Sequence, residues 1–93
     1  MLESVEIEAQ GDHEYVVRLE GDGERAESWF RITPERLADV GGTPDDEEGV
    51  VRRTVEFLAR HQGVPDFPDV VELEDVIAGY DDFVATMTGT PGP

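Results

Sequence analysis

The sequence contains neither cysteine nor lysine among its 93 residues. Without cysteine, disulfide bonds, thiolate metal sites, iron–sulfur clusters and cysteine nucleophiles are all excluded. No apolar run approaches the roughly 18 residues that cross a bilayer. The acidic start Met1-Leu2-Glu3 also differs from the basic start of a signal peptide. We therefore expect a cytoplasmic protein that does not insert into a membrane.

Positive charge is scarce. Seven basic residues, all arginine, stand against 23 aspartates and glutamates, which gives a formal net charge of −16. Contact with the phosphates of nucleic acid, or with an anionic membrane surface, would meet repulsion because no basic cluster offsets it. We expect no direct binding to nucleic acid. The acidity is explained either by a solvated surface, as in a salt-rich cytoplasm, or by selection for a basic partner, which includes mimicry of nucleic acid.

The first third of the chain alternates between apolar and polar residues, which is the pattern of half-buried strands. The predicted strands include residues 5–9, 15–19 and 28–32. Residues 10–12 (Gln-Gly-Asp) and 21–24 (Gly-Asp-Gly-Glu) separate them, and both segments are typical of hairpin turns. Three strands joined in this way form an antiparallel meander, whose single apolar face must be covered.

The next part of the sequence predicts two helices. Thr33-Pro34 and Thr43-Pro44 each combine a capping hydroxyl with a first-turn proline. In the second helix, acidic residues 45–48 lie at the N-terminus and Arg60 and His61 at the C-terminus, as the helix dipole favours. Its apolar residues occupy one sector of a helical wheel, which makes it the clearest helix of the chain.

Residues 69–87 form the last predicted helix. Asp69 and Glu72 have the spacing of a capping box, and apolar residues follow at intervals of three and four. Gly79 lies on the polar side, where it can interrupt the helix without changing the pattern. Two short helices are therefore the alternative.

The predicted fold class is α+β: a three-stranded antiparallel meander followed by two or three helices packed on one face of the sheet. We assign residues 1–87 to this single domain. Residues 88–93, rich in glycine, threonine and proline, are expected to form a disordered C-terminal tail.

No motif for catalysis or metal binding is found in the sequence. His13 and His61 form no metal-binding pair, and no cysteine completes a structural zinc site. Ser4 and Ser28 lie on predicted strands without the G-x-S-x-G turn of a nucleophilic serine. We interpret His61 as a partly packed helix-end residue and His13 as a solvated strand residue. We therefore predict no catalytic residue, no metal site and no cofactor.

The face of the predicted sheet that points away from the helices carries the candidate interaction site. The alternation places four residues there: Val16, Arg18, Trp29 and Arg31. Exposed tryptophan beside arginine is the composition of an interface hot spot. A register slip of one residue would bury Trp29 instead, and the adjacent Phe30 leaves both assignments open. The predicted edge strands lack lysine, a common guard against edge pairing. Their glutamates can serve the same purpose, and a homodimer through the sheet edges is the alternative.

Two segments of the chain, residues 50–58 (VVRRTVEFL) and 74–83 (EDVIAGYDDF), resemble parts of short hypothetical proteins encoded in high-GC prokaryotes. The likeness spans residues 50–83 and consists of packing patterns. It implies no activity and no role for any residue.

Together these observations predict a small acidic, non-enzymatic accessory or regulatory protein that acts by binding another protein. Two alternatives stay open. One is a small enzyme or ligand-binding module, which requires a cleft where His61, Tyr80 and an acid converge. The other is a mimic of nucleic acid, which requires carboxylates along one surface at phosphate-like spacing.

Overall fold

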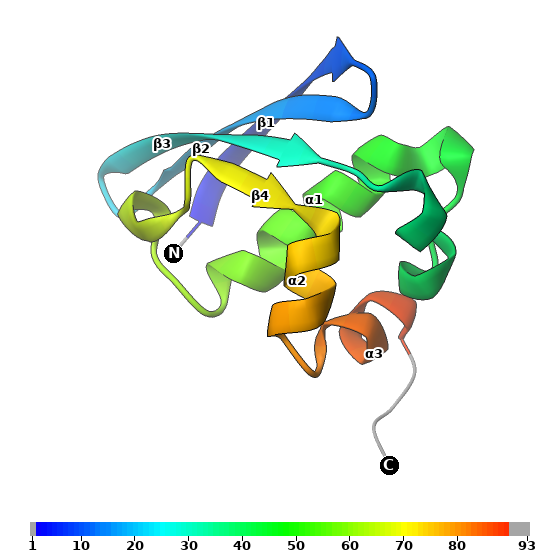
Figure 1. Cartoon of the computed structure of the whole chain (residues 1–93). Coiled ribbons are helices and arrows are strands. Elements are labelled where there is room, and N and C mark those ends of the chain that lie inside the picture. The colour runs from blue at the N-terminus through cyan, green and yellow to red at the C-terminus, as the bar shows by residue number, and fades with distance from the viewer. Residues whose placement is uncertain (1, 90–93) are drawn as a thin grey trace.

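A sheet of four strands with helices packed against one of its faces makes up the fold (Figure 1). The computed structural model describes residues 2–89. The strands lie side by side in chain order: β1 Leu2–Gly11, β2 Glu14–Gly21, β3 Glu24–Arg31 and β4 Val70–Glu72. β1, β2 and β3 pair antiparallel, whereas β4 runs parallel to β3. The α+β class is as predicted, but the sheet is mixed and has one strand more than the meander.

The antiparallel strands are joined by two-residue turns. Asp12 and His13 link β1 to β2, with φ of 46° and 63°, and Asp22 and Gly23 link β2 to β3, with φ of 54° and 78°. Left-handed conformation at both turn residues is the geometry that matches the right-handed twist of a hairpin. The second turn is where the sequence predicts it. The first turn lies further along the chain than predicted, because β1 continues to Gly11.

The fourth strand corrects the prediction that a helix begins at Asp69. Val70–Glu72 instead pairs with the end of β3, and the Trp29 amide donates a hydrogen bond to the carbonyl of Asp69 at 2.8 Å. Without β4, the backbone groups on this edge of β3 would lack protein partners. The β-branched residues Val70 and Val71 suit a strand, and Val71 enters the core beside Phe30. The helix therefore begins only after β4.

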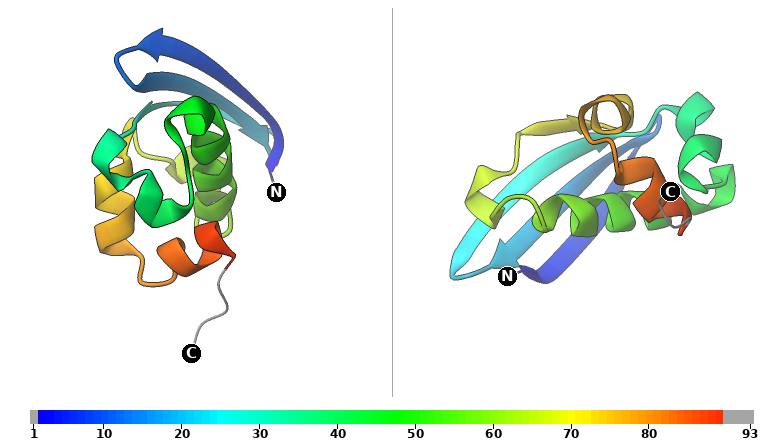
Figure 2. Two further views of the ribbon diagram at one scale, coloured as in Figure 1. Left: turned by 90° about the vertical axis from the view of Figure 1, so that its right-hand side faces the viewer. Right: turned by 90° about the horizontal axis from the view of Figure 1, so that it is seen from below.

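The helices lie together on one side of the sheet, as the two views of Figure 2 show. They are α1 Glu47–Ala59, α2 Leu73–Gly79 and α3 Phe83–Thr88. The break after Gly79 confirms the alternative of two short helices. The helix predicted at Thr33-Pro34 is instead two short 3₁₀ turns, Pro34–Arg36 and Ala38–Val40, followed by Gly41 at a φ of 71°.

The core lies between the sheet and these helices. Its most deeply buried members come from β2, β3, the 3₁₀ turns and all three helices: Val17, Leu19, Phe30, Leu37, Val40, Val50, Val51, Val55, Leu73 and Phe83. The predicted tail begins at Thr88, but Thr88 belongs to α3. The rest of that tail, residues 90–93, lies outside the described residues.

Candidate interaction surface on the outer sheet face

The sheet has a second face, here named the outer face, which points away from the helices. Strand register places four of its residues in one row, one from each strand: Glu8, Val16, Trp29 and Val70. Their neighbours along the strands, such as Val17 and Phe30, belong to the core. Because side chains alternate across a sheet, this row lies on the opposite side from the core.

Trp29 stands at the centre of the row and is 39% exposed, and Val70 beside it is 46% exposed. Phe30 is only 1% exposed, so the register slip that would exchange Trp29 and Phe30 does not occur. Val16 is 4% exposed although it lies outside the core cluster. It is therefore covered from the outer side, where Trp29 is its cross-strand partner.

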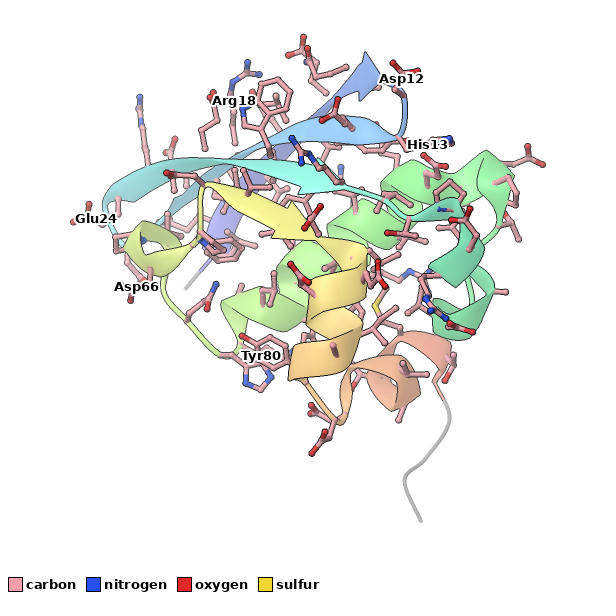
Figure 3. All side chains as sticks on the ribbon, viewed as in Figure 1. Asp12, His13, Arg18, Glu24, Asp66 and Tyr80 are labelled. Carbon is pink, nitrogen blue, oxygen red and sulfur yellow. The ribbon has the colours of Figure 1, made fainter. Side chains whose placement is uncertain are left out.

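Two arginines flank the apolar residues of this row, Val16, Trp29 and Val70. Each arginine contacts glutamates on the neighbouring strands. Arg18 lies 3.0 Å from Glu8 and 3.4 Å from Glu27. The hydrogen bond from Arg18, together with its charge, lowers the pKa of the Glu8 carboxyl. Figure 3 shows Arg18 on the side of the sheet opposite the helices. Exposed ion pairs contribute little to stability, but pairs on both sides of Arg18 limit the positions that its side chain takes.

On the other side of Trp29, Arg31 also contacts two glutamates. Its Nε lies 3.1 Å from a Glu14 oxygen, and its Nη1 lies 3.8 Å from a Glu72 oxygen. All four predicted interface residues are thus brought together on one face. Val70 and Glu72 also belong to this face, although the sequence pattern predicts both in a helix; the adjacent β-branched pair at 70–71 is the signal that indicates a strand.

Carboxylates outnumber arginines on the outer face. The carboxylates are Glu6, Glu8, Glu14, Glu20, Glu27 and Glu72, and the arginines are Arg18, Arg25 and Arg31. Several of these side chains also line an open depression of about 500 Å³ near the turn between β2 and β3. The outer face therefore combines an apolar centre with a negative surround.

A second cluster joins the first hairpin to the start of α1. The Tyr15 hydroxyl donates to one oxygen of Glu47 at 3.0 Å, and Nδ1 of His13 lies 2.6 Å from the other. The Glu47 side chain is only 9% exposed. Burial, then the hydrogen bond to Glu47 and its negative charge, raise the pKa of Tyr15 to about 12. His13 is exposed, as predicted for a solvated residue, but it lies in a turn instead of a strand and contacts a carboxylate.

His61 and Tyr80 lie close together, as the alternative of a cleft requires. Their ring centroids are 5.1 Å apart, and both rings also contact Phe57. A groove of about 260 Å³ is lined by Tyr80 with Glu72 and Asp75, but His61 is not part of its lining. The two rings and an acid therefore do not converge in this groove, and His61 packs against aromatic rings.

Two further properties concern residues 2–89 only. In this range no group of three or more histidine, aspartate or glutamate side chains is placed to hold a metal ion. Over the same residues, no helix combines the length and the apolar character needed to cross a membrane.

Comparison with protein-family models, curated proteins and solved structures finds no match to this chain. The resemblance to short proteins of high-GC prokaryotes therefore stays a prediction.

Proposed function

We propose that the protein is a small non-enzymatic accessory or regulatory protein that binds a partner protein through its outer face. The observation that carries this proposal is the position of Trp29. It is 39% exposed at the centre of the face, between arginines that are held by cross-strand ion pairs. Tryptophan and arginine dominate the binding energy of interfaces, particularly where surrounding residues exclude water.

The geometry of the face supports a preformed site. Val16 underlies Trp29, and Arg18 and Arg31 are each placed between two glutamates. Side chains that are already restrained lose less conformational entropy when a partner binds. A rigid strand surface of this kind suits a flat partner surface and offers no enclosed space for chemistry.

The charge of the face indicates the chemistry of the partner. Glutamates surround the apolar centre, and the whole chain has a formal net charge of −16. We infer a partner with a small apolar contact region and a basic rim, because complementary charge steers association and excludes wrong partners.

A second copy of this chain fits the face poorly. Two copies would each bring the same net negative charge. This face therefore favours a different protein over a homodimer.

The proposal is tested by affinity capture with matched variants. Wild type, Trp29→Ala and Arg60→Ala serve as baits in native lysate; Arg60 is an exposed residue that follows α1, on the helix side. We expect the same partner with wild type and Arg60→Ala, a loss of that partner with Trp29→Ala, and weaker recovery at high salt. Circular dichroism checks that each bait is folded. Equal recovery by wild type and a folded Trp29→Ala variant would contradict the proposal.

A further inference from the structure

β1 forms one edge of the sheet. It is ten residues long, and among residues 2–89 no strand pairs with its second side. The opposite edge is β4, which has only three residues. An edge strand presents unpaired N–H and C=O groups along its length, and proteins commonly protect such edges with lysine, proline or a bulge.

Lysine, proline and bulges are missing from the centre of β1, where the charged side chains are Glu6 and Glu8. Residues 2–11 contain neither lysine nor proline, and the irregularities in the pairing with β2 lie near the two ends, at Leu2/Ser4 and Ala9/Gly11. Residues 4–9 pair with β2 without interruption. This stretch of regular strand is long enough for an additional strand to pair with it.

The core is also incompletely covered along this edge. On the helix-facing side of β1, Val5 and Ile7 are only partly buried, whereas their partners on β2, Leu19 and Val17, are almost fully buried. A groove of about 240 Å³ lies between β1 and α1 and is lined by Leu2 and Val5 from the strand and by Arg52 and Glu56 from the helix. Because the groove is lined by residues 2–5 of β1, an inward side chain of an added strand next to Val5 would enter it.

Charge decides what kind of strand fits. On the outer side, β1 presents Ser4, Glu6 and Glu8. If two copies of β1 paired antiparallel with their outer sides on the same face of a joined sheet, the registers with the longest overlap would place Glu6 opposite Glu6 or opposite Glu8. Like charges directly opposite each other destabilise a sheet, whereas opposite charges stabilise it. A second copy is therefore disfavoured, and a strand with basic outward residues is favoured.

We propose that the free edge of β1 binds an extended segment of another protein as a fifth strand, with lysine or arginine on its outward side and apolar residues on its inward side. Backbone hydrogen bonds to residues 4–9 supply affinity, and the alternating side chains supply specificity. This site differs from the Trp29 site, because it uses the strand edge and the groove beside α1. The two proposals are independent, so failure of one does not contradict the other.

The first experiment uses a short synthetic peptide that alternates lysine and valine, titrated into the ¹⁵N-labelled chain. We expect chemical-shift changes and slower amide exchange at residues 4–9, with little change at Trp29. A peptide that alternates glutamate and valine should not bind. No shift at residues 4–9, or shifts confined to the outer face around Trp29, would overturn the proposal.

Backbone pairing is separated from simple charge attraction by N-methylation. One version of the lysine–valine peptide carries an N-methyl group on every lysine, and the other carries one on every valine. Only alternate amides of an added strand face its neighbour, so one version should lose binding and the other should keep it. If both versions bind as well as the parent peptide, the interaction is charge attraction alone and the proposed strand pairing is wrong.

The role of charge is tested by a matched pair of variants. Glu6→Lys reverses an exposed charge on β1, and Glu74→Lys makes the same change on α2. Glu6→Lys should weaken binding of the lysine–valine peptide by about fivefold relative to Glu74→Lys, because a favourable cross-strand pair becomes a repulsive one. Equal affinity of the two variants would show that the charge on β1 does not select the partner.

Discussion

Replacing Glu47 by glutamine should measurably destabilise the fold. The side chain of Glu47 is 9% exposed and accepts hydrogen bonds from Tyr15 and His13, which belong to the first hairpin. Glutamine has nearly the same size but no charge, so the change alters the interactions and leaves the packing intact. A hydrogen bond to a charged group contributes about 1.5–3 kcal/mol. We expect a loss of about 1 kcal/mol, below that range, because the amide oxygen of glutamine still accepts from Tyr15 and solvent screens the contact with half-exposed His13.

The measurement is urea denaturation followed by circular dichroism at neutral pH. Glu48→Gln is the matched control, because Glu48 is the next residue in the chain and is exposed. It should change the free energy of unfolding by no more than about 0.5 kcal/mol. A double-mutant cycle with Tyr15→Phe should give a coupling energy of about 0.5–3 kcal/mol, as expected for residues in one hydrogen-bond network.

Two results would refute this reasoning. One is a Glu47→Gln variant as stable as Glu48→Gln. The other is strict additivity of Glu47→Gln and Tyr15→Phe, which would mean that the two side chains contribute independently. Either result would show that the carboxylate does not hold the hairpin against α1.

Three further predictions concern the same hairpin and the glycines. In an absorbance titration, the phenol of Tyr15 should ionise at about pH 12, identified by comparison with Tyr15→Phe. Since the ordinary pKa is about 10 and the folded state holds the proton more tightly, stability should fall as pH rises from about 10 to about 12, and a Glu47→Gln variant should show less of this fall. His13 has a φ of 63°, a conformation that glycine adopts freely, so His13→Ala should be less stable than His13→Gly by about 1 kcal/mol in urea denaturation; equal stability would argue against backbone strain at this turn. A Cβ at Gly42 would lie 2.5 Å from a core valine of α1, whereas one at Gly79 meets nothing within 4 Å. Gly42→Ala should therefore lower the melting temperature by the equivalent of about 1–3 kcal/mol, while Gly79→Ala should raise stability by up to about 1 kcal/mol, and the reverse order would contradict the packing described.

The parts of the fold that were predicted correctly are those specified by local pattern. The period-two alternation through the first three strands correctly predicts Val17 in the core, because neighbouring side chains on a strand point to opposite faces. For the adjacent Trp29 and Phe30 it left two assignments open, and the structure decides between them, with Phe30 buried and Trp29 exposed. The apolar sector of α1 and the turn at Asp22 and Gly23 are equally local signals. The alternation therefore predicts an outer face, but not which of Trp29 and Phe30 belongs to it.

Tertiary structure determined the conformation and the contacts of those residues for which the local sequence pattern is ambiguous or gives no signal. Residues 69–72 satisfy a capping box and also a short strand, and the unpaired edge of β3 selected the strand because its backbone groups needed partners. The contact between His13 and Glu47 joins residues 34 positions apart, and no spacing rule relates them. Sequence periodicity records which face of an element is apolar, but not which distant element covers it or completes its hydrogen bonds. For that reason the sequence predicted the Trp29 face only as one of two assignments, whereas the exposure of Trp29, β4, the buried carboxylate and the open groove beside β1 are decided by the tertiary structure.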